Sequence, residues 1–411
     1  MSWALYDFAT SAYFSVIFTF VFATYFTENI ASNHIEGTML WGYTISASAL
    51  LIAITSPFLG AIADYGGRQK SWLMFFTFIG IISIAFLWFA YPYTSSIPLV
   101  LTCIFISNFA LEVGLVFYNS FLPKLSSSKY LGRISGWAWG FGYLGGILCL
   151  IISLYLFIKG DLSIWVDKQD DANIRAIALF VSAWIIIFSI PMFLFVEQKI
   201  GKPLKNTQAL KKGFSELFRT IKNLPSQKDL LIFLVARILY IDGLNALLAL
   251  GGVYAAGTFN LKINDIMIFG IIINLTAGLG AALFAILDDY IGSKKTILIS
   301  LICLIINYIL LLNIESISLF WMIGPVIGIF VGPIQASSRA FLARLAKPEE
   351  ITRMYGLYAL SGKATSFLAP FFVGLVTIHS GSQKIGMSML LPFFLIGFCL
   401  LLFVNDNGIN D

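Results

Sequence analysis

The sequence predicts an all-α polytopic membrane protein with twelve transmembrane helices in two six-helix lobes that have the same orientation. Three observations lead to this fold class. Only 11% of the 411 residues are charged, whereas soluble domains carry roughly 25%. The apolar share is 59%, and because a spanning helix needs roughly 20 largely apolar residues, the chain has enough for about twelve spans. In addition, two polar segments of the first half recur in the second half.

Apolar windows of about 19 residues place six spans in each half of the chain. They are expected at 4–29, 40–63, 71–91, 97–121, 132–158 and 174–196, and then at 229–256, 264–287, 295–313, 317–342, 353–379 and 383–404. The loops between them are short, except for the basic segment 197–228. We expect this segment to form a surface helix on anionic lipid of the inner leaflet. It would link an N-terminal lobe, 1–196, to a C-terminal lobe, 229–411.

The distribution of positive charge predicts the orientation. One set of alternate loops holds 19 Lys and Arg residues, and the opposite set holds five. Because loops rich in Lys and Arg stay in the cytoplasm, both termini are expected there. The compact loops favour the inner membrane of a bacterium as the location. The net charge of +5 is too small and too scattered for a nucleic-acid-binding surface.

An internal repeat relates the two halves. The loop DYGGRQK at 64–70 recurs as DYIGSKK at 289–295, which is 225 positions later. The segment FLPKLSSSKYLGRISG at 121–136 recurs in part at 341–356, which is 220 positions later. Because each repeat contains an even number of spans, the two copies keep the same orientation. The halves should therefore be related by an axis along the membrane normal.

The repeated loop is interpreted as a gate on the cytoplasmic face. An acid at a helix end, a turn glycine and the basic residues that follow are suited to hold neighbouring helices together in an outward-open state. Topogenic charge alone would explain the basic residues but not the repeated Asp and Gly. The gating candidates are Asp64, Gly67, Arg68, Lys70, Asp289, Gly292 and Lys295.

Four ionisable residues are expected deep in the membrane, where a charge persists only if it is paired or faces water. Glu112, Arg237 and Lys363 lie at a similar depth, about 13 Å from the cytoplasmic face at 1.5 Å per residue, and Asp242 lies slightly further out. The bases are suited to bind the carboxylate of a zwitterion and the acids its ammonium, or one acid to couple transport to protons. The alternative is two salt bridges that only hold the bundle together.

Neutral polar residues extend the candidate substrate site. They are Tyr118, Asn119, Asn245, Asn274 and Gln335, with Ser337, Ser338 and Arg339 close to the last. Each has the alternative role of bonding two helices together. Asp7, at the inner end of the first span, is assigned either to a gate or to the site.

Several segments together resemble a known family. The loop at 64–70 resembles the signature between the second and third spans of the major facilitator superfamily. The segments WALYDFATSAYFSVIFTFVFATYF at 3–26, GRISGWAWGFGYLGG at 132–146 and GPIQASSRAFLARL at 332–345 are similar to the branch that includes the autophagy-linked vacuolar amino-acid effluxers. The resemblance covers almost the whole chain and implies a two-lobed transporter with its substrate site between the lobes.

The sequence therefore predicts a secondary active transporter of a small polar metabolite, with an amino acid as the first candidate and the proton as a candidate coupling ion. The sequence has no metal-ligand spacing, no nucleophile and base at one depth and no nucleotide-hydrolysing loop. We therefore expect no cofactor and no enzymatic activity. The alternative hypothesis is a transport-silent receptor or scaffold with the same fold and the basic linker as its partner surface.

Overall fold

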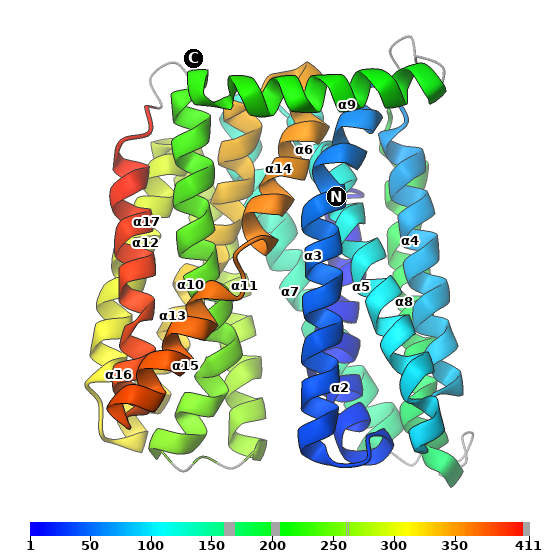
Figure 1. Ribbon diagram of the computed structural model, residues 1–411, viewed down its shortest axis with the longest axis vertical. Helices are drawn as coiled ribbons and strands as arrows, with labels where there is room; N and C mark the ends of the chain where they lie inside the picture. Colours follow the sequence, from blue (N-terminus) through cyan, green and yellow to red (C-terminus); the bar gives the residue numbers. More distant parts are fainter. Residues whose placement is uncertain (160–168, 199–205, 260, 262, 406–411) are drawn as a thin grey trace.

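Twelve helical spans make up the computed structural model, which describes residues 1–159, 169–198, 206–259, 261 and 263–405. Each span is long and apolar enough to cross a membrane, so the predicted number of spans is confirmed. Figure 1 shows the first six spans, which begin in blue, on one side of the molecule and the last six, which end in red, on the other. We call these two groups the N-lobe and the C-lobe.

The first span of the N-lobe is not a regular α-helix. It runs from Ala4 to Ile30 and contains α1 (Ala4–Ala12), α2 (Val21–Tyr25) and π-helical segments at Tyr13–Phe20 and Phe26–Ile30. Such π-helical turns are frequent at functional sites. The other N-lobe helices are α3 (His34–Gly66), α4 (Gln69–Phe86), α5 (Ile97–Asn119), the short α6 (Leu122–Leu125), α7 (Leu131–Ser153) and α8 (Ala172–Phe195).

The C-lobe contains a span that is broken in the middle. The sequence predicts a continuous helix at 353–379, but residues 364–367 form a turn between two half-helices, and Figure 1 shows the change of direction in orange. The C-lobe helices are α10 (Lys228–Phe259), α11 (Ile263–Ile291), α12 (Ser293–Leu312), α13 (Ile317–Leu345), the half-helices α14 (Ile351–Lys363) and α15 (Leu368–Ser380), α16 (Gln383–Ser388) and α17 (Leu390–Leu402).

The linker contains the expected surface helix, α9 (Asn206–Asn223), and Figure 1 shows it lying across one end of the bundle. We call this end the α9 face. Gly213 allows α9 to lie directly on α3, because a Cβ at this position would be 3.0 Å from the Ile62 nitrogen. Leu217 is buried beneath the helix, and Phe218 packs edge-on against Phe58. The start of the linker, 199–205, lies outside the described residues.

Two helix pairs bring the lobes together near the α9 face. In the pair α7 and α11, a Cβ on Gly136 would lie 2.4 Å from Ala285 Cβ. In the pair α3 and α14, a Cβ on Gly356 would lie 2.5 Å from the Ser56 carbonyl oxygen. Small residues allow this close approach of membrane helices. Gly136 and Gly356 are matching positions of the repeat, so the two contacts are related by the repeat.

Candidate functional site: a charged cavity between the lobes

A cavity of about 360 Å³ lies between the lobes. Helices of both lobes line it: α1, α5 and α7 on one side, and α10, α11, α13 and α14 on the other. All predicted substrate-site residues except Asp242 and Tyr118 are in its lining. The charged and amide side chains of the lining are those of Asp7, Glu112, Asn119, Arg237, Asn245, Asn274, Gln335, Arg339 and Lys363.

A second cavity of about 430 Å³ adjoins the first and shares Phe14, Ser15, Tyr143 and Asn274 with it. Its lining also includes Phe20, which lies in the half of the first span that is further from the α9 face, and residues near the far end of α10. The charged cavity therefore continues away from the α9 face.

An ion pair joins the two lobes in the charged cavity. Lys363 Nζ of α14 donates to Glu112 Oε1 of α5 at 2.7 Å. The two side chains are 29% and 19% exposed, respectively, so both retain access to the cavity. Lys363 is the last residue of α14, and the negative end of a helix dipole favours a cation. The break in the eleventh span therefore provides a favourable position for this lysine in the middle of the membrane.

Arg237 of α10 lines the same cavity without an acidic partner. Its Nη1 donates to the Tyr358 carbonyl oxygen and to Ser361 Oγ, both at 2.6 Å, and its Cζ lies 3.3 Å from the centroid of the Tyr358 ring. Gly362 leaves room for this packing, because a Cβ there would lie 3.2 Å from Nη1. None of the ion pairs among the described residues involves Arg237. Its positive charge is therefore uncompensated at the cavity wall.

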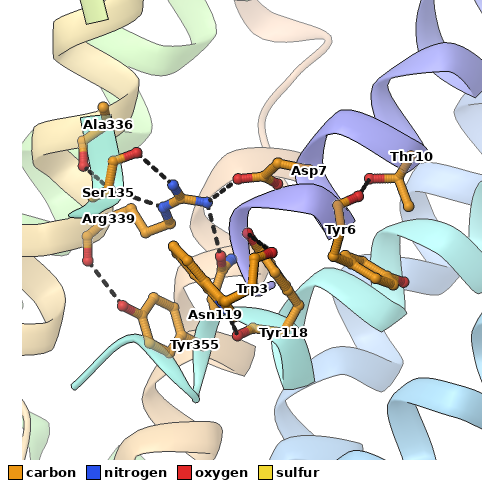
Figure 2. Close-up of polar contacts among 10 residues, drawn as sticks. All are labelled: Trp3, Tyr6, Asp7, Thr10, Tyr118, Asn119, Ser135, Ala336, Arg339 and Tyr355. Atoms are coloured by element: carbon orange, nitrogen blue, oxygen red, sulfur yellow. Dashed lines mark hydrogen bonds and ion pairs between the residues drawn. The ribbon is translucent and has the colours of Figure 1, made fainter. Parts of the chain in front are cut away.

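Arg339 of α13 lines the cavity, and Figure 2 shows its polar contacts with helices of the N-lobe. Its Nη1 donates to Asp7 Oδ2 at 3.0 Å and to Asn119 Oδ1 at 3.4 Å. Its Nε donates to Ser135 Oγ at 2.9 Å and its Nη2 to the Ser135 carbonyl oxygen at 2.7 Å. These partners belong to α1, α5 and α7. One buried side chain of the C-lobe therefore holds three helices of the N-lobe.

Aromatic rings surround the Arg339 guanidinium. Trp3 and Tyr118 stack with their centroids 4.5 Å apart, and Arg339 Cζ lies 5.0 Å from the first ring and 5.9 Å from the second. Trp3 Nε1 donates to the Tyr118 carbonyl oxygen and Tyr118 OH donates to the Trp3 carbonyl oxygen, both at 3.1 Å. Tyr118 is fully buried in this stack. It supports the Arg339 network instead of lining the cavity.

Asp242 also lies outside the cavity lining. Its Oδ2 accepts a hydrogen bond from the Ala369 amide at 3.2 Å, and its Oδ1 has no partner in the part of the chain that is described. Ala369 is the second residue of α15. The carboxylate therefore caps the N-terminus of a half-helix, where backbone amides lack intrahelical partners. Asp242 contacts the break in the eleventh span from the neighbouring α10.

The two repeated acids reach across to the opposite lobe. Asp64, near the end of α3, accepts hydrogen bonds from the amides of Thr352 at 3.0 Å and Arg353 at 2.8 Å, at the start of α14. Asp289, near the end of α11, accepts one from the Arg133 amide of α7 at 3.1 Å and pairs with Arg133 Nε at 3.2 Å. Each acid caps a helix of the other lobe. We call these contacts the α3–α14 latch and the α7–α11 latch.

The repeated glycines, Lys70 and Lys294 make their contacts within their own lobes. Gly67 and Gly292 have φ values of 59° and 88°, in the region that favours glycine, and they allow the turns into α4 and α12. Lys70 Nζ donates to the Val196 carbonyl oxygen after α8 at 2.7 Å. In the C-lobe, Lys294 Nζ makes a similar hydrogen bond, because it donates to the Val404 carbonyl oxygen after the end of α17. Two gating candidates are exposed, namely Arg68 and Lys295.

A buried ion pair within the C-lobe lies beside the α7–α11 latch and is not expected from the sequence. Arg344 Nη1 of α13 pairs with Asp288 Oδ1 of α11 at 2.5 Å, and its Nη2 lies 3.6 Å from Asp289 Oδ1. Arg344 also contacts the N-lobe, because its Nε donates to the Ser128 carbonyl oxygen at 3.2 Å. At the matching positions of the repeat, the other half has Lys124 and Ala63. The ion pair beside the α7–α11 latch therefore has no counterpart at the matching positions of the α3–α14 latch.

The comparisons with known proteins identify the family. The family described as "Vacuole effluxer Atg22 like" matches residues 30–410. The chain belongs to this Atg22-like family. Among its relatives, the MFS-type transporter YxiO of Bacillus subtilis (strain 168) is 26% identical over 100% of this chain and 95% of its own length. Autophagy-related protein 22-1 of Penicillium rubens is 23% identical over 90% of this chain and 76% of its own length.

Solved structures share the fold of this Atg22-like protein. The major facilitator superfamily transporter FucP in the outward conformation has a TM-score of 0.78 at 12% identity, with 99% of this chain and 98% of FucP covered. The proton:xylose symporter XylE has a TM-score of 0.73 at 12% identity, with 98% and 94% covered. The predicted major facilitator fold is confirmed, and the family and its fold are those of transporters, not of enzymes.

Arg339 is the main residue of the Atg22-like cavity whose role sequence reasoning missed. From the sequence, Arg339 is expected only as a polar residue near the end of a span. One signal was available, because Arg339 follows Asn119 by 220 positions, the offset of the second repeat. Two residues at matching positions of the repeat come into contact if both lie close to the axis that relates the two halves. Here Arg339 Nη1 lies 3.4 Å from Asn119 Oδ1. Ser135, the other main partner of Arg339, has no comparable signal in the sequence.

Proposed function

We propose that this Atg22-like protein is a secondary active transporter of amino acids that works by alternating access between the N-lobe and the C-lobe. The observation that carries the proposal is the Glu112–Lys363 ion pair, because it joins the lobes inside a cavity that both lobes line. Ionisable residues at membrane depth are retained mainly for function. A partly exposed pair of opposite charges offers a zwitterion one partner for each of its own charges.

The alternating-access proposal rests on which end of the cavity is closed. The Asp7–Arg339 pair and the two latches join the lobes at the α9 face, and the second cavity extends the other way. If the basic α9 face is cytoplasmic, as the distribution of Lys and Arg favours, the described state faces outward and both termini are cytoplasmic. The full-length match to YxiO supports a bacterial cell membrane as the location.

Arg237 is the proposed partner of the substrate carboxylate. It lines the cavity with an uncompensated positive charge, and the Tyr358 ring and Ser361 hydroxyl hold its guanidinium in place. Guanidinium groups bind carboxylates through charge-assisted hydrogen bonds that are stronger than neutral ones. The substrate ammonium would then face Glu112, in competition with Lys363. The amides of Asn245, Asn274 and Gln335 supply further hydrogen-bonding groups.

Proton coupling is proposed at Glu112. Protonation of its carboxylate removes the charge that holds Lys363, and the lobes then separate at this point at a lower energetic cost. Bound ammonium has the same effect, because it offers Glu112 another cation. Two proteins of the same fold, FucP and XylE, are proton symporters, which is consistent with this proposal.

Uptake of labelled amino acids into proteoliposomes tests the proposal. We expect Glu112→Gln and Lys363→Ala to abolish the transport of amino acids that the wild-type protein carries. The matched controls Glu315→Gln and Lys384→Ala change exposed residues and should transport normally. Wild-type rates in both site variants would remove the proposed site. A wild-type protein that transports no amino acid would show that the substrate class is wrong.

A free amino acid and its methyl ester test the role of Arg237. Loss of a hydrogen bond to a charged group costs about 1.5–3 kcal/mol, so Arg237→Ala should weaken inhibition of uptake by the free acid about 10- to 100-fold. The ester lacks the carboxylate charge, and its inhibition should change little. An equal loss for both compounds would contradict the assignment.

A pH gradient across the vesicle membrane tests the coupling. Transport should depend on the gradient in the wild-type protein, and the dependence should disappear in Glu112→Gln. The alternative, a transport-silent receptor or scaffold, predicts no uptake and a cysteine at position 112 that thiol reagents reach from neither side of the membrane.

A further inference from the structure

A groove of about 340 Å³ lies on the seam where the two lobes meet along α7 and α11. Its lining is apolar or aromatic, and it is separate from the charged cavity except that Tyr143 lines both. The residues that form its floor and rim include Trp137, Gly140 and Leu144 of α7 and Leu275, Gly278 and Leu279 of α11.

Two facing glycines produce the groove. A Cβ on Gly140 would lie 3.2 Å from the Gly278 carbonyl oxygen, so the helix backbones approach closely and leave a hollow without side chains between the larger residues of the rim. Trp137, Leu144 and Leu279 of the rim are exposed. In a chain that spans the membrane, exposed apolar side chains of this kind face the hydrocarbon of the bilayer.

The length of the groove matches the thickness of the hydrocarbon layer of one leaflet. Along α7 it extends from Trp137 to Ile147, which is about 15 Å at 1.5 Å per residue. This is half of a hydrocarbon core of about 30 Å. Trp137 is close to the start of α7, so the groove lies in the leaflet next to the α9 face.

A basic cluster lies where the headgroup of a lipid in this groove would be. Arg133 is one helical turn before Trp137 on α7, and 34% of its side chain remains exposed although it pairs with Asp289. Its Cζ lies 5.4 Å from the ring of Tyr130, and Lys129 Nζ lies 5.7 Å from the same ring. Basic residues between transmembrane helices bind lipid phosphates, and aromatic rings prefer the membrane interface.

We propose that a phospholipid binds at this seam, with one acyl chain in the groove and its phosphate at Arg133 and Lys129. The positive charges of Arg133 and Lys129 complement the negative charge of the phosphate, and the groove accommodates one acyl chain. Because α7 and α11 belong to different lobes, the bound lipid bridges them beside the α7–α11 latch. It therefore favours the state in which that latch is closed. The proposal does not depend on which substrate is transported.

Photolabelling in vesicles tests the proposal. The full-length protein is reconstituted in phosphatidylcholine vesicles that contain a phosphatidylglycerol with a diazirine in its acyl chain, and labelled peptides are located by mass spectrometry. We expect label on 137–147 and 275–282, and its loss in Leu279→Trp, which fills the groove. Leu283→Trp, an equal change one turn along α11 and outside the groove, should keep the label. Unchanged labelling in Leu279→Trp, or equal labelling of all exposed helices, would overturn the proposal.

The contribution of the phosphate is tested separately. A diacylglycerol with the same diazirine chain should label the groove less than the phosphatidylglycerol probe, and Lys129→Gln should reduce labelling by the latter. Equal labelling by both probes would refute the headgroup contact. If light scattering shows dimers that Leu279→Trp dissociates, the groove is a contact between two copies of the chain and not a lipid site.

Discussion

Arg339 of the C-lobe makes hydrogen bonds to three residues of the N-lobe at the wall of the cavity. Its guanidinium contacts Asp7, Asn119 and Ser135 in a buried environment. A buried charge that loses its partner is strongly destabilising, whereas an exposed pair contributes little. The Asp7–Arg339 pair should therefore matter more for the stability of the described state than a surface ion pair does.

We expect Asp7→Asn to lower the free energy of unfolding by about 3–5 kcal/mol, because it leaves Arg339 buried without its counter-charge. The measurement is thermal unfolding in detergent. The control is Glu216→Gln, whose partner Arg219 is 71% exposed, and for which the loss should be about 0–1 kcal/mol. Equal losses in the two variants would show that the Asp7–Arg339 pair does not hold the lobes.

Depth in the membrane can be predicted from the sequence, but the direction of a side chain cannot. Glu112, Arg237 and Lys363 are conspicuous in apolar windows, and all three line the cavity. Asp242 lies at a suitable depth, yet it points to the start of α15. Its direction depends on where the eleventh span breaks, which is a tertiary feature. The sequence therefore identifies the charges of the site but not which of them face the cavity.

At the scale of helices, the number of spans and their approximate positions follow from hydropathy, but the break in the eleventh span does not. Gly362 and Pro370 flank the turn at 364–367. However, α13 contains Pro325 and Pro333 and continues through both. Proline alone therefore does not decide where a membrane helix breaks, because neighbouring helices satisfy the backbone groups that it frees. Here Asp242 satisfies an amide of the second half-helix.

The glycines of the latching helices provide a prediction at this scale. In Gly136→Ala and Gly356→Ala, the new Cβ would clash with Ala285 and with the Ser56 carbonyl oxygen, respectively. Both variants should keep the helices apart and open the α9 face. We expect a cysteine at Ser135, which is fully buried, to react faster with a membrane-impermeant thiol reagent in a background without native cysteines.

The control for these variants is Gly42→Ala. Apart from the backbone of its own helix turn, no described residue comes within 4 Å of a Cβ at that position, so the substitution should leave the reaction rate unchanged. If all three variants react at the wild-type rate, close packing at these glycines does not keep the α9 face closed.

For the whole molecule, the repeat makes the two latches alike but not equal. Beside the α7–α11 latch, Arg344 pairs with Asp288 within the C-lobe and donates to the Ser128 carbonyl oxygen of the N-lobe, whereas the matching positions of the other half hold Lys124 and Ala63. Lys124 is exposed, and the position that matches Asp288 offers it no carboxylate. The lobes should therefore separate more easily on the α3–α14 side.

We expect Arg344→Gln to shift the protein toward a state open at the α9 face, because it removes the hydrogen bond from Arg344 to the Ser128 carbonyl oxygen of the N-lobe and leaves Asp288 and Asp289 without this cation. Lys124→Gln should shift it less. Spin labels on the two lobes at the α9 face report the distance distribution by double electron–electron resonance. An equal shift in both variants would mean that the difference between the latches has no effect on the opening.

The reciprocal capping of α7 and α14 has a consequence for dynamics. The amides of Arg133, Thr352 and Arg353 find their acceptors in the opposite lobe, so they lose their hydrogen bonds whenever the lobes part at the α9 face. Their rates of exchange with deuterium are then set by the time the protein spends unlatched. Three backbone positions of the unmodified chain thus record the conformational equilibrium, and a substrate that shifts this equilibrium changes their exchange rates without any label.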